Sequence, residues 1–338
     1  MLGMSDLVPL VETRRGGTRE CVHFGALAVV DAGGRVLAQA GDPYWRTFTR
    51  STLKPLQALP FVAGGGVQHF GLTQANLALL CASHNGEPMH VQQVEAILAK
   101  AGVPWRRLQC GCHVPMFAEL GAWPPPAPGS YDERHHNCSG KHSGFLAYCV
   151  QHGLPLDTYL EPGHPLQQAI RGAVAEAVGL PPEQLAMGID GCSAPNYAMP
   201  LAHLARGFAR LAGGDGPSAA SFALLADAMT AHPELVSGTG RNDLDFMRAG
   251  RGDWVTKVGA DGVQVVASRS RGAALALKIA DGNKLALFAA TVAALDQLGW
   301  LDEAQRQALR PWRHEVIASI KGAAVGERKA VFRLAPPA

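Results

Sequence analysis

The stretch Ser51-Thr52-Leu53-Lys54 decides what fold and chemistry we expect of this chain. It follows a strand-like region and opens an apolar segment, residues 53–63, that we expect to be a helix ended by Gly64-Gly65-Gly66. Residues i and i+3 of a helix are neighbours on one face, so the Ser51 hydroxyl and the Lys54 amine can meet. A serine needs an adjacent base to be a nucleophile at neutral pH, and a neutral lysine can supply it. The alternative is a capping serine with a solvated lysine one turn later.

The composition is that of a globular protein that acts on small molecules. Of the 338 residues, 47% are hydrophobic and 17% are charged, and the net charge of +2 is too small for a nucleic-acid-binding surface. Residues 1–17 contain no apolar run of signal-peptide length, and no run reaches transmembrane length. The seven scattered cysteines indicate reduced thiols rather than a disulfide framework. We therefore expect a cytoplasmic protein without nucleic-acid or membrane partners.

Strand-like segments cluster at the two ends of the chain, and helix-like segments lie between them. The expected strands are residues 27–30 with 36–39, 254–258 with 263–268, and 273–279; helices are expected from about residues 166, 201 and 222, and over 285–298. The proline-rich residues 123–129 are expected to form an extended surface loop. The pattern predicts an α/β protein whose antiparallel sheet is built from both chain ends and flanked by helices.

The same pattern predicts how one catalytic domain, residues 1–338, is organised. An α/β lobe is expected over about residues 8–65 plus 236–333, and an inserted, largely helical lobe over about residues 66–235. The two ends can share one sheet only if they meet in space.

Two further motifs carry polar groups, and their order along the chain is informative. Ser83-His84-Asn85 follows a short apolar run, and Lys257-Val258-Gly259 lies on an expected strand. Alone, the first is an ordinary polar turn and the second a solvated edge-strand lysine. The order Ser-x-x-Lys, Ser-x-Asn, Lys-x-Gly resembles that of the penicillin-recognising serine enzymes and the serine-dependent glutaminases. This resemblance favours a catalytic Ser51 and implies a serine-β-lactamase/glutaminase-like fold.

Cysteines and histidines gather in two glycine-rich segments. Residues 135–144 contain Cys138, Lys141 and His142, and residues 188–195 contain Cys192. Zinc prefers thiolate and imidazole ligands, and a lysine ligates a metal only when deprotonated. From the residues alone, a metal site and a pair of reduced buried thiols are equally good interpretations.

Taken together, these segments resemble the class 3, rhizobial-type L-asparaginases, also called the asparaginase II family. The matching stretches are Arg50-Ser51-Thr52-Leu53-Lys54-Pro55, Ala82-Ser83-His84-Asn85, Asn137-Cys138-Ser139-Gly140-Lys141-His142, Gly188-Ile189-Asp190-Gly191-Cys192-Ser193-Ala194-Pro195, Ser237-Gly238-Thr239-Gly240-Arg241 and Lys257-Val258-Gly259. The resemblance implies that the protein hydrolyses L-asparagine to L-aspartate and ammonia and forms a homodimer.

The resemblance also implies two serine–lysine tandems and a metal site. The tandems map to Ser51 with Lys54 and to Ser83 with Lys257. The family's zinc position maps onto three residues: Cys138, Lys141 and Cys192. Ser51 is the expected nucleophile with Lys54 as its base, whereas Ser83 and Lys257 are expected to deliver a proton to the leaving ammonia. A nucleophilic Ser83 remains an alternative.

Four residues are candidates for binding the substrate. Arg50 and Asp190 are expected to hold the α-carboxylate and the α-ammonium group, and Asn85 and His142 are further candidates. Glutaminase activity remains an alternative, since one methylene changes binding by only about 1–3 kcal/mol. Two further functions remain as alternatives: a β-lactamase or D,D-peptidase-type hydrolase, and a non-enzymatic amino-acid-binding protein.

Overall fold

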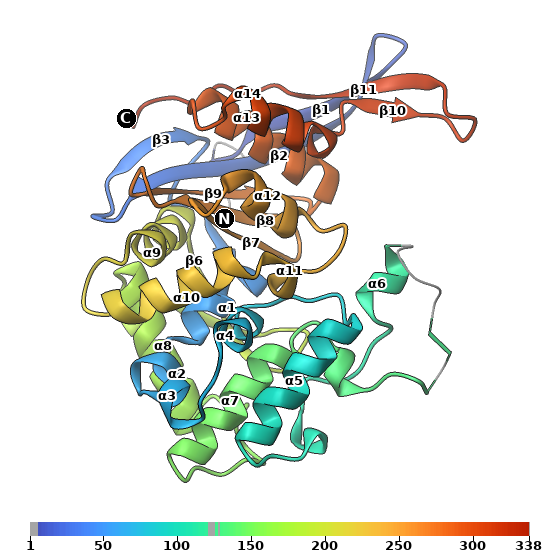
Figure 1. The fold of residues 1–338 in the computed structure, drawn as a ribbon. Coiled ribbons are helices and arrows are strands. Elements are labelled where there is room, and N and C mark those ends of the chain that lie inside the picture. The colour runs from blue at the N-terminus through green and yellow to red at the C-terminus, as the bar shows by residue number, and fades with distance from the viewer. Residues whose placement is uncertain (1–5, 121–125, 128, 338) are drawn as a thin grey trace.

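The main sheet is antiparallel and contains strands from both ends of the chain (Figure 1). This computed structural model describes residues 6–120, 126–127 and 129–337. The strand order is β10-β11-β1-β2-β9-β8-β7, and β3 pairs with β2. The strands are β1 (Val8–Arg15), β2 (Thr18–Asp31), β3 (Val36–Ala40), β7 (Trp254–Gly259), β8 (Val263–Ser268), β9 (Ala273–Ile279), β10 (Val316–Ala318) and β11 (Ala324–Ala330). The N-terminal β2 pairs directly with the C-terminal β9, so the predicted sheet from both chain ends is confirmed.

Alternate residues of β2 face two different hydrophobic cores. Leu27 lies in the core that contains α13 (Lys284–Gln297), and Ala28 lies in the core that contains α9 (Leu201–Gly213). α13 packs against β1, β9 and β11, whereas α9 packs against β2, β8 and β9. A strand buried on both faces shows this period of two, with side chains pointing to opposite sides in turn. The sheet is therefore covered by helices on both faces.

The chain between the strands of the main sheet is mostly helical. Its helices are α1 (Lys54–Gln57), α2 (Leu59–Ala63), α3 (Gly66–His69), α4 (Gln74–Leu80), α5 (Pro88–Lys100), α6 (Met116–Glu119), α7 (Ser139–Gln151), α8 (Pro165–Val178), α9, α10 (Ala219–Ala231), α11 (Pro233–Val236) and α12 (Asn242–Gly250), and α14 (Glu303–Leu309) follows α13. The predicted helices that became α8, α9, α10 and α13 are confirmed. The predicted loop over 123–129 falls largely outside the described residues. In the described part of the chain, every helix is too short or too polar to span a bilayer.

The helix predicted over residues 53–63 is wrong in one respect, because it is two helices. α1 ends at Gln57, and α2 begins at Leu59 after the single residue Ala58. Pro60 has no backbone N–H with which to continue the hydrogen-bond ladder of α1. The serine–lysine stretch therefore lies on a short 3₁₀ turn, η2 (Arg50–Leu53), followed by a single turn of α-helix.

A second, three-stranded sheet was not predicted from the sequence. Its order is β4-β6-β5, with β4 (Arg46–Phe48), β5 (Ala186–Ile189) and β6 (Pro195–Pro200). β4 leads into η2, and the turn from β5 to β6 contains Asp190 and Cys192. This small sheet therefore joins two of the sequence motifs that are far apart in the chain.

Candidate active site

Lys54 lies at the centre of the candidate site with only 1% of its surface exposed. Its Nζ donates hydrogen bonds to the Ala82 carbonyl at 2.6 Å, the Ser83 hydroxyl at 2.9 Å and the Asn137 carbonyl at 3.1 Å. All three acceptors are neutral oxygens. The structure thus brings Lys54 to Ser83, whereas the sequence pairs it with Ser51.

Ser51 has different surroundings from Ser83. Ser51 is half-buried and Ser83 is buried. Within the described chain, no hydrogen bond of the Ser51 hydroxyl to another protein group is found. Both serines line the same cavity of about 220 Å³. One hydroxyl is therefore fixed by Lys54, and the other is open to a ligand in that cavity.

The backbone directly before Ser51 is strained. Arg50 has φ of 50°, in the left-handed region that costs a non-glycine residue on the order of 1–3 kcal/mol. The Asn196 side chain holds this conformation: its oxygen accepts from the Arg50 N–H at 3.0 Å, and its amide donates to the Arg50 carbonyl at 3.0 Å. The same oxygen accepts from the Thr49 hydroxyl at 3.1 Å. Because Asn196 belongs to β6, the small sheet positions the turn that presents Ser51.

Lys257 forms a fully buried ion pair with Asp243 of α12. The Lys257 Nζ lies 3.3 Å from Asp243 Oδ2, and neither side chain has exposed surface. The Val258 N–H and the Thr256 hydroxyl donate to the Asp243 carboxylate at 2.9 and 3.1 Å. Burial lowers the pKa of Lys257 to about 8; the Asp243 charge opposes this change and the Lys54 charge adds to it. No hydrogen bond between Lys257 and Ser83 is found in the described chain, so the second tandem is not a direct contact.

Asn85 has protein partners at both ends of its side-chain amide. Its Nδ2 donates to Glu87 Oε1 at 2.8 Å and to the Thr239 carbonyl at 2.9 Å, and its Oδ1 accepts from Arg241 at 3.0 Å. Glu87 also accepts from the Thr239 N–H at 2.9 Å. The amide therefore fastens the loop after Ser83 to the loop before α12 and positions Arg241, which lines the cavity.

Arg50 and Asp190 are bound to each other. The Arg50 Nε donates to Asp190 Oδ1 at 2.9 Å, and Arg50 also pairs with Asp261. Among the described residues that line the cavity of Ser51 and Ser83, neither Arg50 nor Asp190 is present. Each of the two groups is therefore already paired within the protein, and neither is a free partner for a substrate in this cavity.

The predicted metal ligands Cys138, Lys141 and Cys192, here named the thiol cluster, do come together. The Lys141 Nζ lies 3.0 Å from the Cys192 Sγ, and all three residues are buried. A hydrogen bond between the thiols lowers the pKa of Cys192 and raises that of Cys138. Burial acts to lower the pKa of Lys141, but the charges on Cys192 and Cys138 outweigh it and the pKa is raised.

The donor atoms of the thiol cluster fit a zinc ion. Zinc binds sulfur and nitrogen in tetrahedral sites, and the cluster offers two sulfurs and an amine. His142 lies beside the cluster, and its Nδ1 forms a hydrogen bond with the Tyr159 hydroxyl at 2.7 Å. Its buried Nε2 has no partner at hydrogen-bonding distance and angle among the described residues. In the described part of the chain, no three His, Cys, Asp or Glu side chains are placed so that they could hold a metal ion together. A metal here would therefore depend on Lys141 as a ligand.

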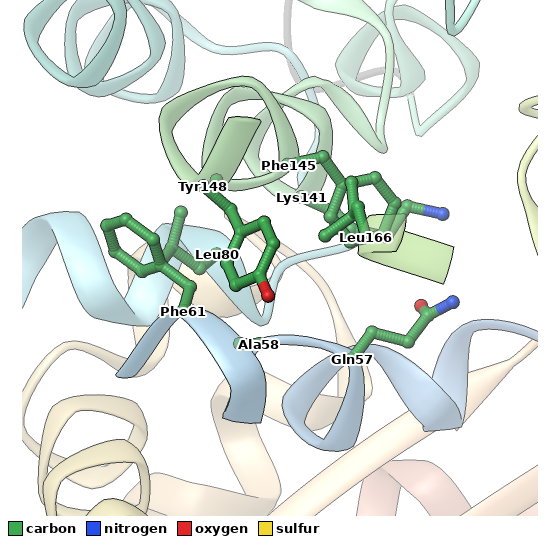
Figure 2. Close-up of a pocket in the computed structure, with 9 residues that line it drawn as sticks. Gln57, Ala58, Phe61, Leu80, Lys141, Phe145, Tyr148 and Leu166 are labelled. Atoms are coloured by element: carbon green, nitrogen blue, oxygen red, sulfur yellow. The ribbon is translucent and has the colours of Figure 1, made fainter. Parts of the chain in front are cut away.

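A small pocket beside the thiol cluster is too small for a substrate. Lys141, Gln57, Phe145 and Leu166 are among its lining residues (Figure 2), and its volume is about 10 Å³. That volume holds about one water molecule. The Lys141 stem runs past the Phe145 ring, with Nζ 5.4 Å from the ring centroid. The cavity of Ser51 and Ser83 is the better candidate for the substrate.

Some residues of this site had a sequence signal and others had none. Arg241 lies in the stretch Ser237–Arg241 that resembles the family, so the sequence did contain a signal for it. Asp243 and Asn196 carry no motif of their own, and only their tertiary contacts reveal them. These contacts join segments that are 14 and 146 residues apart in the chain.

The comparison with known families places the chain among enzymes that hydrolyse amides. The sequence profile of the L-asparaginase II family matches residues 11–330, nearly the whole chain. The protein therefore belongs to the L-asparaginase II family, and the predicted membership is confirmed.

The chain was also compared with solved structures and with curated proteins. A β-lactamase from Mycobacterium bovis is similar in structure, with 20% sequence identity and a TM-score of 0.42. The match covers 81% of this chain and 94% of that one. None of the curated proteins matches the chain.

Proposed function

We propose that the protein hydrolyses the side-chain amide of L-asparagine to L-aspartate and ammonia. The observation that carries this proposal is the buried Lys54, bonded to Ser83 in the cavity that Ser51 lines, in a chain of the L-asparaginase II family. Ser51, Lys54, Ser83 and Lys257 are here named the serine–lysine cleft.

In the proposed mechanism, Ser51 attacks the amide carbon. Its proton passes through the Ser83 hydroxyl to neutral Lys54, and the backbone N–H of Ser51 itself stabilises the oxyanion. The carbon–nitrogen bond then breaks, the nitrogen takes up a proton through Ser83 and leaves as ammonia, and water hydrolyses the aspartyl ester. Lys257, with its pKa of about 8, is able to exchange a proton near neutral pH.

We also propose that Cys138, Lys141 and Cys192 hold one zinc ion. Bound there, zinc would neutralise the two thiolates and fix the two glycine-rich segments relative to each other. The homodimer, the cytoplasmic location, the two-lobe division of the chain, and the roles of Arg50, Asn85, His142 and Asp190 in substrate binding stay predictions.

The test is ammonia release from L-asparagine and L-glutamine, with a chromogenic cephalosporin as the competing substrate. We expect turnover of asparagine, and a loss of about 10⁴-fold in kcat for Ser51→Ala with binding of aspartate retained. Faster turnover of glutamine would instead define a glutaminase. Cephalosporin hydrolysis without ammonia release from asparagine would contradict the proposal.

A further inference from the structure

The cavity of Ser51 and Ser83 is also lined by two aromatic side chains, here named the aromatic wall. They are Phe288 of α13 and Trp312, and their rings meet edge to face with centroids 5.1 Å apart. The Trp312 Nε1 donates to Asp245 Oδ2 at 3.1 Å, which fixes the indole. Met116 is a further apolar residue of the same lining. L-asparagine has no apolar group that could contact this wall.

The charges that line the cavity are all positive. Arg241 and Lys284 are its ionisable lining residues, and no carboxylate is among the described residues that line it. Lys284 lies one helical turn before Phe288, so the two side chains are neighbours on one face of α13. The aromatic wall therefore has a cation at its edge. An α-ammonium group would be repelled there, whereas a carboxylate would be attracted.

We propose that the cleft also accepts β-aspartyl amides whose leaving amine is an aromatic amino acid. This inference rests on the proposed function. The aspartyl part is small, has no ring and carries an ammonium group as well as a carboxylate, so a ring with a carboxylate beside it belongs to the amine side of the scissile bond. The Ser51 oxygen bonds to the amide carbon and the carbon–nitrogen bond breaks. The amine nitrogen takes the proton, and water then releases aspartate.

The test uses three dipeptide substrates and L-asparagine. β-L-Aspartyl-L-phenylalanine carries both the ring and the carboxylate, its C-terminal amide lacks the carboxylate, and β-L-aspartyl-L-alanine lacks the ring. We expect kcat/KM for the phenylalanine dipeptide to exceed that for the alanine dipeptide about tenfold. We expect kcat/KM for the phenylalanine dipeptide to exceed kcat/KM for its C-terminal amide about threefold, the effect of an exposed ion pair between the carboxylate and Lys284.

Two variants separate the contributions of the ring and the charge. Trp312→Leu should lower the phenylalanine-to-alanine ratio toward one. Lys284→Gln, an exposed substitution that spares the core, should lower the ratio of phenylalanine dipeptide to its amide toward one. Using ratios removes any general loss of active protein from the comparison.

The outcomes distinguish this inference from the proposed function. Asparagine turnover with no cleavage of any dipeptide, or with equal rates for the phenylalanine and alanine dipeptides, would overturn the inference alone. Failure to hydrolyse asparagine as well would overturn the proposed function and the inference with it.

Discussion

The serine–lysine cleft and the thiol cluster both contain buried lysines, and Lys257 of the cleft has different surroundings from Lys141 of the cluster. Burial by itself lowers the pKa of a lysine. In the cleft, Lys257 lies near the charge of Lys54 and has one carboxylate partner, and its pKa falls to about 8. In the cluster, Lys141 lies beside two sulfurs, and its pKa rises. Burial therefore dominates the pKa of Lys257, whereas the charges of its two sulfur neighbours outweigh burial for Lys141.

The difference suggests a division of labour between the two regions. The cleft borders a cavity and contains hydroxyls, so it is suited to proton transfer. The cluster contains two sulfur donors and borders a water-sized pocket, so it is suited to holding a cation. Asp190 and Asn196 link the two regions, because they flank Cys192 in the chain and both contact Arg50, which directly precedes Ser51.

The largest effect is expected from removing the Lys54 amine. Lys54→Met keeps the length and apolar stem of the side chain but leaves no base bonded to Ser83. We expect kcat for asparagine to fall at least about 1,000-fold, the usual size of general-base catalysis. The measurement is steady-state ammonia release, with circular dichroism to check the fold. A loss smaller than about tenfold would show that Lys54 is a structural residue.

A smaller loss is expected when the Arg50 turn is released. Asn196→Ala removes the hydrogen bonds that hold the strained peptide before Ser51, so the serine should be less well placed. We expect kcat to fall about tenfold to a hundredfold, equivalent to about 1–3 kcal/mol. Asn196→Asp is the matched control, because it keeps the acceptor but loses the donor and should be intermediate. Equal kcat for wild type and Asn196→Ala would disprove a positioning role.

Breaking the thiol cluster tests the metal directly. Cys192→Ala should remove most of the bound zinc and lower the melting temperature, because two glycine-rich segments lose their common ligand. The matched control is Cys149→Ala, a buried cysteine of α7 outside the cluster, which should keep its zinc. Elemental analysis of the purified proteins gives the result. Equal zinc content in wild type and Cys192→Ala would exclude the proposed ligand set.

The smallest effect is a shift in the pH profile. The Asp243 carboxylate raises the pKa of Lys257 against the effect of burial, so Asp243→Asn should lower that pKa further below about 8. Because Lys257 is proposed to deliver a proton to the leaving ammonia, the falling limb of kcat/KM should move to lower pH by roughly one unit. Glu303→Gln, an exposed change on α14, serves as the control. An unmoved limb would mean that Lys257 does not set it.

The sequence predicted the sheet more completely than the site. β7 and β8 were predictable because segments with β-branched residues flank a Gly-containing turn, and β9 because it is a short apolar run between two such turns. α13 was predictable because its apolar residues follow a clear helix start. The pairing of Lys54 with Ser83 was not predictable. A lysine side chain is long enough to reach several neighbours, and the choice depends on where the Ala82 and Asn137 carbonyls lie. The ion pair of Lys257 with Asp243 likewise depends on the packing of α12 against β7.

The most direct test of the account is to identify the serine that becomes acylated. The enzyme would be mixed with L-aspartic acid β-hydroxamate, quenched in acid within milliseconds and digested, and the aspartyl adduct located by peptide mass spectrometry. We expect the adduct on the peptide that contains Ser51, and its absence in Ser51→Ala. An adduct on Ser83 in the wild type, or normal turnover by Ser51→Ala, would contradict the central claim.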